Sequence, residues 1–372
     1  MSQDIKETRE KKLRVIIAGG GTGGHLFPGI AVGNELKKRC PDSDILFVTA
    51  GRELESKILG KAGFRQESLS VEGIKGKGIV KSLASLFKLP GSIFQSVAVI
   101  KRFSPGIILG VGGYSSGPLC LSGRLMRVPV VIHEQNSYPG LTNRLLSRIV
   151  DRIFISFEES REYFPAGKFC LTGNPVRDIF TKGYEPLAGQ KEEFTIFVTG
   201  GSQGAVAVNS VFIEALGIMK GMGISPRVIH HTGQVDYERV VKEYDERGLK
   251  GDISAFIDNM LEAYSSADIF IGRAGAGTIF ELAAMGRPAI LIPLPASANN
   301  HQVLNAMALV RAGGAEMILQ DKLDGRRLAE KLIEFMNNRD QLVKMGENSR
   351  KVAILDSAKI ITDQMTELIG EN

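Results

Sequence analysis

Residues 13–25 read LRVIIAGGGTGGH, an apolar run followed at once by a glycine-rich turn. An apolar, β-branched run of this kind is typical of a strand that is buried on both faces of a parallel sheet. The glycine turn after it leaves backbone N–H groups free at the start of a helix, where the helix dipole favours an anion. This stretch therefore predicts the first strand–turn–helix unit of an α/β fold, with a turn suited to a phosphate-bearing ligand.

The same pattern recurs along the chain. The strand and turn IFVTGGSQGA at 196–205 resemble the first ones, and further glycine turns follow at 110–117 (GVGGYSSG) and 272–278 (GRAGAGT). Helix-like segments separate the strand-like runs, which is the pattern of a doubly wound parallel sheet. We expect an α/β protein of two Rossmann-like domains that face each other across a cleft. The strand-like runs are residues 13–18, 44–49, 106–111, 128–133, 152–156, 194–199, 227–231, 268–272 and 288–293.

The chain has 372 residues, a length that favours two domains. Its composition, 43% hydrophobic and 23% charged, is ordinary for a soluble globular protein. Three scattered cysteines, Cys40, Cys120 and Cys170, exclude a disulfide scaffold and are expected to be reduced thiols. The polar first residues predict no secretory signal, and no run approaches the ~20 apolar residues of a membrane-spanning helix.

Two common interpretations of glycine turns do not fit the rest of the sequence. Gly19, Gly21 and Gly24 match the dinucleotide pattern G-x-G-x-x-G, but LFVTAG at 46–51 lacks the acidic residue that a ribose needs there. The P-loop pattern G-x-x-x-x-G-K-[ST] is absent from the sequence. Both observations argue against an NAD-dependent oxidoreductase and an ATPase. The D-x-D sequence at 42–44 precedes a strand, the wrong end of a sheet for a site, and predicts a turn without a bound metal.

The charge distribution is uneven, because no carboxylate lies between Glu72 and Glu134. Within this stretch, apolar residues at helical spacing lie beside lysines. One interpretation is a core-facing helix with a solvated basic face, and the other is a surface that contacts an anionic membrane. No basic stripe with interleaved aromatic residues supports nucleic-acid binding. The candidate membrane residues are Lys75, Lys81, Leu83, Leu86, Phe87 and Lys88.

A series of short motifs runs in order along nearly the whole chain. They are GGGTGGHLFPG (19–29), GVGGYSSGP (110–118), HEQNSYPGLTNR (133–144), GNPVR (173–177), GGSQGA (200–205), FID (256–258), GRAGAGTIFE (272–281) and HQVLNA (301–306). Together they resemble the MurG family. Its members add N-acetylglucosamine to undecaprenyl-pyrophosphoryl-N-acetylmuramoyl-pentapeptide in bacterial cell-wall synthesis.

The resemblance implies the GT-B fold of two Rossmann-like domains, in which the last helix returns to the first domain. We expect an N-terminal acceptor- and membrane-side domain at 1–177, a C-terminal UDP-sugar-binding domain at 178–354, and a final segment at 355–372 packed on the first. It also implies a peripheral protein at the cytoplasmic face of the bacterial plasma membrane. The expected partners are the undecaprenyl-linked muramoyl-pentapeptide acceptor, the anionic membrane surface and other cell-wall synthesis proteins, with no nucleic acid.

The resemblance also implies the reaction and its residues. The reaction is an inverting substitution that moves N-acetylglucosamine from UDP-N-acetylglucosamine to a 4-hydroxyl of the acceptor, with no cofactor and no essential metal. His25, Tyr114 and Glu134 match acceptor-side positions, and either His25 or Glu134 is the base that removes the hydroxyl proton. The donor-binding candidates are Thr22, Gly23, Gly24, Asn136, Arg177, Ser202, Gln203, Ile257, Ala276, Gly277, Thr278, Glu281 and Gln302.

Two rival functions remain open. A UDP-N-acetylglucosamine epimerase of the same fold would use the same donor without an acceptor. A non-catalytic nucleotide-sugar-binding protein would bind the donor without turnover. The HEQN motif and the carboxylate-free stretch favour the transferase over the epimerase, and turnover of the UDP-sugar would exclude the binding protein.

Overall fold

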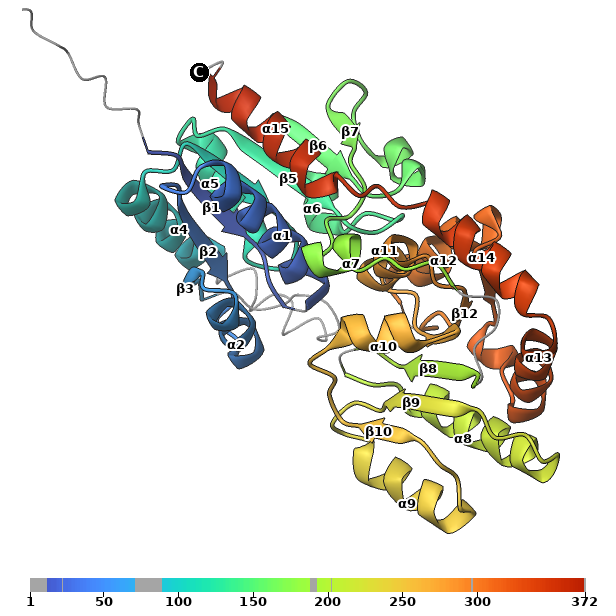
Figure 1. The fold of residues 1–372 in the computed structure, drawn as a ribbon. Coiled ribbons are helices and arrows are strands. Elements are labelled where there is room, and N and C mark those ends of the chain that lie inside the picture. The colour runs from blue at the N-terminus through green and yellow to red at the C-terminus, as the bar shows by residue number, and fades with distance from the viewer. Residues whose placement is uncertain are drawn as a thin grey trace, which may run out of the picture. The chain divides into compact units, whose positions relative to one another are not determined.

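Figure 1 shows a computed structural model of the chain, which describes residues 12–21, 23–70, 89–187, 193–201, 203–295 and 297–370. The chain divides into two compact units. The first comprises the described residues within Met1–His133, Leu141–Phe154 and Lys359–Asn372, and the second those within Glu134–Gly140 and Ile155–Ala358. The domain limits expected from the sequence stay a prediction.

Among the residues that the structure describes, the first sheet has seven strands in the order β3-β2-β1-β4-β5-β6-β7. Val15 of the central strand β1 pairs in parallel with Ile45 on one side and Ile107 on the other. The order 3-2-1-4-5-6 is that of a Rossmann sheet. The strands are β1 (Arg14–Ala18), β2 (Asp44–Thr49), β3 (Arg65–Ser68), β4 (Ile107–Gly110), β5 (Val130–Glu134), β6 (Arg152–Ile155) and β7 (Phe169–Leu171). The helices of the first unit are α1 (Gly23–Arg39), α2 (Glu53–Lys61), α4 (Leu89–Phe103), α5 (Ser116–Leu125), α6 (Leu141–Leu146) and α15 (Ser357–Gly370).

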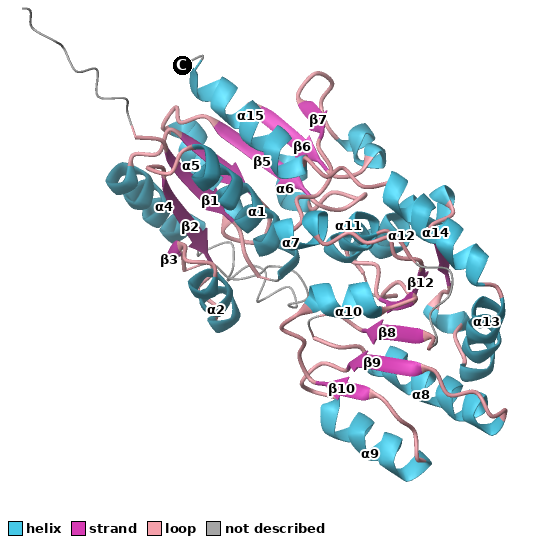
Figure 2. Ribbon diagram, in the orientation of Figure 1, coloured by secondary structure: helices cyan, strands magenta, loops and turns pink. Residues whose placement is uncertain are grey.

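In the described part of the second unit, six parallel strands form a sheet in the order β10-β9-β8-β11-β12-β13, again a Rossmann order. Strands and helices alternate along this part of the chain (Figure 2). The strands are β8 (Thr195–Thr199), β9 (Arg227–His231), β10 (Asp252–Ser254), β11 (Ile269–Gly272), β12 (Ala289–Leu291) and β13 (Ala315–Met317). The helices are α7 (Asp178–Lys182), α8 (Val206–Gly221), α9 (Tyr237–Arg247), α10 (Met260–Ser266), α11 (Ala276–Met285), α12 (His301–Ala312), α13 (Gly325–Asn337) and α14 (Arg339–Lys351).

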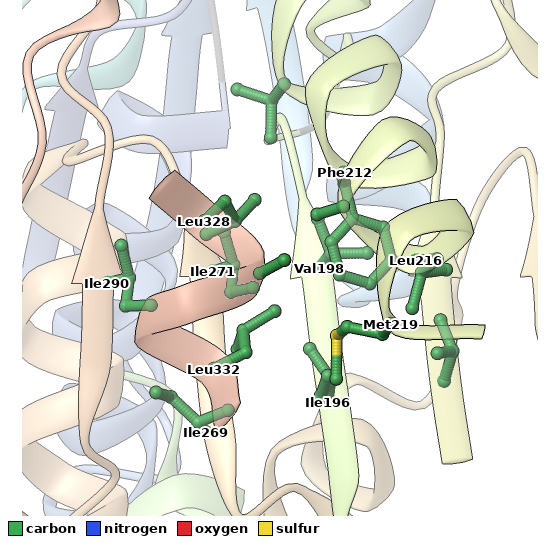
Figure 3. Close-up of a cluster of buried hydrophobic side chains, with 14 of the residues drawn as sticks. Ile196, Val198, Phe212, Leu216, Met219, Ile269, Ile271, Ile290, Leu328 and Leu332 are labelled. Atoms are coloured by element: carbon green, nitrogen blue, oxygen red, sulfur yellow. The ribbon is translucent and has the colours of Figure 1, made fainter. Parts of the chain in front are cut away.

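Helices cover both faces of the second sheet. Ile196 and Val198 of β8 pack with Phe212 of α8 and Leu332 of α13 (Figure 3). Phe197 lies between them in the chain and packs on the opposite face, in the apolar cluster that α10, α11 and α12 share. A strand buried on both faces needs apolar residues at every position, which explains the continuous apolar runs of the sequence. The predicted fold of two parallel α/β sheets is confirmed.

The last helix, α15, packs within the first unit. Ile361 and Met365 on this helix are fully buried. Arg152 of β6 donates to Glu367 at 2.9 Å, and a further ion pair joins Asp363 to Arg39 of α1. Partly exposed ion pairs of this kind contribute about 0–1 kcal/mol each, so burial of the apolar face is the larger stabilising term.

Candidate functional site

The first glycine turn of the second unit lies between β8 and α8. The Gly201 N–H donates to Thr199 Oγ1 at 3.0 Å, and Thr199 Oγ1 lies 2.8 Å from His231 Nδ1 at the end of β9. Gly204 has φ +76°, and a Cβ there would lie 2.1 Å from a carbonyl oxygen of the segment after β9. Only glycine fits this close approach. The turn is thus held against the end of β9, and it carries the exposed donor candidate Gln203.

The second glycine turn of this unit lies between β11 and α11. Gly275 is the N-cap of α11, and no side chain of the described residues caps this helix. The first turn contains Ala276, Gly277 and Thr278, whose N–H groups lie at a helix N-terminus that favours an anion. A Cβ at Gly277 would meet no atom within 4 Å, so the space beside this turn is open. The turn therefore suits the phosphate groups predicted for it.

Hydrogen bonds from Arg273 connect this second turn to the loop after β12. Its guanidinium donates to the carbonyl oxygens of Ile292 and Pro293, both at 3.1 Å, and to Gln320 Oε1 at 2.6 Å. Burial lowers the pKa of the Arg273 guanidinium from its high ordinary value. The cation adds to the positive potential at the start of α11. We did not predict Arg273 from the sequence, although a charged residue inside a glycine turn is a visible signal.

Glu281 lies on α11, and its carboxylate faces two side chains from other elements. Tyr264 of α10 donates its hydroxyl to Glu281 Oε2 at 3.2 Å, and Arg177 Nη2 lies 3.6 Å from Oε1. The Arg177 guanidinium also lies 4.6 Å from the centroid of the Phe180 ring. Burial raises the pKa of Glu281, and the neighbouring Arg177 and Tyr264 oppose this shift. The structure thus brings two predicted donor residues together, and Tyr264 joins them as a residue that we did not predict.

Glu134 ends β5 and is 2% exposed. Its Oε1 accepts the Asn136 backbone N–H at 3.0 Å and Asn136 Nδ2 at 3.3 Å, and its Oε2 accepts the Gly140 N–H at 3.0 Å. Hydrogen bonds to an ionised carboxylate are stronger than neutral ones. Both oxygens of Glu134 therefore take part in holding the loop 134–140.

Asn305 of α12 is fully buried and joins three segments of the second unit. Its Nδ2 donates to Asn136 Oδ1 at 3.2 Å and to the Ala274 carbonyl oxygen at 3.3 Å, and its Oδ1 accepts the Ser137 N–H at 2.9 Å. Asn136, a predicted sugar contact, is thereby placed beside the turn that precedes α11. Asn305 is a further residue that we did not predict.

The remaining donor candidates of this unit lie at the same edge of its sheet. Ile257 is half-buried, follows β10 and packs against the apolar cluster around Phe197. Gln302 lies in the first turn of α12, and its Oε1 accepts the Leu294 N–H at 3.0 Å. The carboxyl ends of parallel strands share one edge, where open α/β sheets bind their ligands.

In the first unit, the turn after β1 touches the turn after β4. The Gly20 N–H donates to the Gly112 carbonyl oxygen at 3.3 Å, and a Cβ at Gly113 would lie 2.3 Å from the Gly20 carbonyl oxygen. His25 is half-buried in the first turn of α1, after Gly23 and Gly24. Tyr114 is 38% exposed and directly follows the second turn. These acceptor-side candidates, His25 and Tyr114, therefore share the carboxyl edge of the first sheet.

Glu55 of α2 braces the turn after β1. It is 1% exposed, and its carboxylate accepts the backbone N–H groups of Gly21 and Arg52. Arg52 Nη1 donates to the Gly21 carbonyl oxygen at 3.0 Å. The turn that presents His25 is thus held by a buried acid that we did not predict.

Several predicted residues lie outside the part of the chain that the structure describes. Two are the donor candidates Thr22 and Ser202. The others are the membrane candidates Lys75, Lys81, Leu83, Leu86, Phe87 and Lys88. Among the described residues, no group of three or more His, Cys, Asp or Glu side chains could hold a metal ion.

Comparison with known proteins places the chain in a family. The model of the glycosyltransferase family 28 N-terminal domain matches residues 15–155, and that of the C-terminal domain matches 195–362. The UDP-N-acetylglucosamine--N-acetylmuramyl-(pentapeptide) pyrophosphoryl-undecaprenol N-acetylglucosamine transferase of Syntrophus aciditrophicus (strain SB) is 43% identical over 357 residues, 96% of this chain and 99% of the relative. The chain belongs to the MurG family. A MurG-family relative with the same name, from Geobacter sp. (strain M21), is 43% identical over 354 residues, 95% of each chain.

Solved structures show the fold of the MurG family. MurG of Acinetobacter baumannii superposes with a TM-score of 0.77 at 28% identity, over 95% of this chain and 99% of that one. A UDP-N-acetylglucosamine 2-epimerase superposes with a TM-score of 0.68 at 14% identity, over 97% and 98% of the two chains. At that identity the second likeness shows the fold alone. The predicted MurG resemblance and GT-B fold are confirmed.

Proposed function

We propose that this chain transfers N-acetylglucosamine from UDP-N-acetylglucosamine to the 4-hydroxyl of undecaprenyl-linked N-acetylmuramoyl-pentapeptide, which converts lipid I to lipid II. The observation that carries the proposal is the 43% identity, over 96% of the chain, to a transferase of that name. Each unit supplies a part that the reaction needs. The second has an uncapped helix N-terminus beside Glu281 and Arg177, and the first presents His25 and Tyr114 at one sheet edge.

The second unit is proposed to hold the donor. The N–H groups at the start of α11 and the Thr278 hydroxyl bind the diphosphate, and the Glu281 carboxylate accepts hydrogen bonds from the two ribose hydroxyls. Asn136 and Gln302 are neutral side chains suited to sugar hydroxyls. As the bond to the anomeric carbon breaks, negative charge grows on the departing UDP. Donors already aimed at that charge stabilise the transition state more than the ground state.

The first unit is proposed to supply the base. The imidazole of His25 removes the proton from the acceptor 4-hydroxyl, whose oxygen then attacks the anomeric carbon with inversion. Glu134 holds the 134–140 loop through the three hydrogen bonds to Asn136 and Gly140. We therefore assign the role of the base to His25 and the role of holding the 134–140 loop to Glu134.

The need for an acceptor separates the transferase from its rivals. We expect UDP-N-acetylglucosamine alone to remain unchanged in the presence of the protein, and UDP to be released once the lipid-linked acceptor is added. A coupled assay for UDP measures this. Conversion of the donor without an acceptor would instead support the epimerase, and donor binding without turnover in the presence of acceptor would support the binding protein.

No helix among the described residues is long and apolar enough to span a bilayer. We infer a peripheral contact with an anionic membrane through a group of exposed apolar side chains on and after the packed helices α5 and α6. This group, here called the leucine patch, comprises Leu121, Leu125, Leu141, Leu145 and Ile149. Leu125, Leu141 and Leu145 are 71%, 69% and 66% exposed. Clustered exposed apolar side chains of this kind mark an interaction surface.

Cations accompany the leucine patch. Arg127 lies after α5, Arg144 and Arg148 lie on and after α6, and all three are exposed. The exposed Arg124 of α5 is paired with Asp151 at 3.1 Å. Each cation near an anionic surface contributes about 1 kcal/mol, while the apolar side chains enter the headgroup region. The combination of leucines and arginines suits an anionic bilayer better than an apolar protein partner.

Replacing Leu141 and Leu145 together by serine is expected to weaken binding to vesicles that contain anionic lipid by about tenfold or more. A fully buried leucine side chain contributes about 1.5–3 kcal/mol, and these two are only partly buried in the headgroups. Co-sedimentation measures the binding. Met222→Ser, at a 62% exposed position after α8 in the second unit, is the matched control. Vesicle binding equal to that of the wild type would contradict the role of the patch.

A further inference from the structure

Tyr264 is a buried polar residue to which the proposed mechanism gives no part. It is 1% exposed, and its ring lies in an aromatic cluster. The ring lies edge-on to Phe180 and Phe197, with centroids 5.7 Å and 5.4 Å away, and stacks on Phe270 at 5.7 Å. Such a cluster is filled as well by phenylalanine as by tyrosine. Packing in the aromatic cluster therefore does not account for the hydroxyl group of Tyr264.

The Tyr264 hydroxyl has one hydrogen-bond partner among the described residues, Glu281 Oε2 at 3.2 Å. Burying a hydroxyl without a partner costs free energy, so this hydroxyl is stable in its apolar surroundings because of Glu281. The helices α10 and α11, which carry the two residues, pack against each other. Since the aromatic cluster fixes the ring, the position of the hydroxyl is fixed as well.

We propose that Tyr264 is a positioning residue that holds the Glu281 carboxylate in the plane required to accept both ribose hydroxyls, and so sets the preference of the site for ribonucleotides. The inference rests on the proposed function, in which Glu281 binds the ribose of the donor. Tyr264 is not proposed to contact the donor. It acts through Glu281.

Two contacts define the plane of the Glu281 carboxylate. Oε2 accepts the Tyr264 hydroxyl, and Oε1 faces Arg177 Nη2 at 3.6 Å. A carboxylate with a partner on one oxygen alone turns more freely about its last side-chain bond than one with a hydrogen bond on one oxygen and an ion pair on the other. Each oxygen has a further lone pair for a ribose hydroxyl. Loss of the Tyr264 hydroxyl would free Oε2 and leave the buried charge with fewer partners.

The test is the variant Tyr264→Phe, with UDP and 2′,3′-dideoxy-UDP as probes in calorimetry. We expect the affinity for UDP to fall about tenfold, as for loss of a hydrogen bond to a charged group. The affinity for 2′,3′-dideoxy-UDP is expected to stay at the wild-type value, because that nucleotide has no hydroxyl for Glu281. In turnover assays the KM for the UDP-sugar should rise, and kcat should stay near the wild-type value.

Tyr244→Phe is the matched control. Tyr244 of α9 is also 1% exposed, and its hydroxyl lies 3.0 Å from His230 Nδ1, away from Glu281. This variant loses a buried hydroxyl in the same unit, so we expect it to lower the melting temperature without changing the ratio of the two nucleotide affinities. In the Glu281→Ala background, Tyr264→Phe is expected to have no further effect on UDP affinity, because the carboxylate through which Tyr264 acts is absent.

Three results would overturn the inference. An equal loss of affinity for UDP and 2′,3′-dideoxy-UDP would show that Tyr264 serves the fold. An unchanged UDP affinity in Tyr264→Phe would show that Glu281 needs no tether. A full additional loss in the Glu281→Ala background would show that Tyr264 acts through another group. A wild-type protein that binds no UDP would instead overturn the proposed function itself.

Discussion

Replacing His25 by alanine is expected to lower kcat by about 10²–10⁴-fold, the usual contribution of a positioned base. The affinity for UDP should stay near the wild-type value, because the diphosphate and the ribose are assigned to the second unit. His25 is half-buried in the first turn of α1, where it follows the glycine turn after β1. Steady-state kinetics at saturating substrates, together with calorimetry for UDP, separate the two effects. A near-normal kcat in this variant would place the base elsewhere.

Glu134→Ala provides the contrast to the His25 variant. We expect this substitution to lower kcat as well, but it also removes the three hydrogen bonds that hold the 134–140 loop. We therefore expect the melting temperature of the Glu134 variant to fall, while that of the His25 variant stays close to the wild type. If Glu134→Ala lowered kcat with no loss of thermal stability, the assignment of the base would pass to Glu134.

Replacing Glu281 by alanine is expected to weaken UDP binding by about 10- to 150-fold. The variant loses charge-assisted hydrogen bonds to the ribose, which are worth ~1.5–3 kcal/mol. The Arg177 guanidinium, 3.6 Å from Glu281 Oε1, also loses its carboxylate partner. Calorimetry with UDP measures the change, and Glu330→Ala at an exposed position of α13 is the control. An unchanged affinity would remove Glu281 from the donor site.

The central strands of both sheets could be predicted from the sequence. The apolar runs predict nine strands, and the structure has a strand in each of them. The four strands that we did not predict, β3, β7, β10 and β13, are the edge strands of the two sheets. Strand β3, with the sequence RQES, has no buried residue. An edge strand is paired on one side and partly exposed, so its sequence needs no apolar run.

The glycine turns of the site were predictable, and the side chains that support them were not. Glycine marks its own turn, because positions such as Gly204 with φ +76° exclude other residues. Tyr264 and Asn305 act on partners 17 and 169 residues away in the chain. Each lies in a helix and has the burial of an ordinary core residue, so no local pattern separates it from its neighbours. The contact between Arg177 and Glu281 could not be predicted from the sequence, because the two residues lie far apart in the chain and meet only in the folded structure.

Transfer of N-acetylglucosamine to a lipid-linked acceptor can be tested through the structure of the product. The protein is incubated with UDP-N-acetylglucosamine and undecaprenyl-linked N-acetylmuramoyl-pentapeptide, and the product is analysed by mass spectrometry and NMR. We expect a lipid-linked disaccharide in which N-acetylglucosamine is joined in the β-configuration to the muramoyl 4-hydroxyl, with one UDP released for each sugar transferred. Recovery of unmodified acceptor, with the UDP-sugar intact or converted to its epimer, would contradict the account.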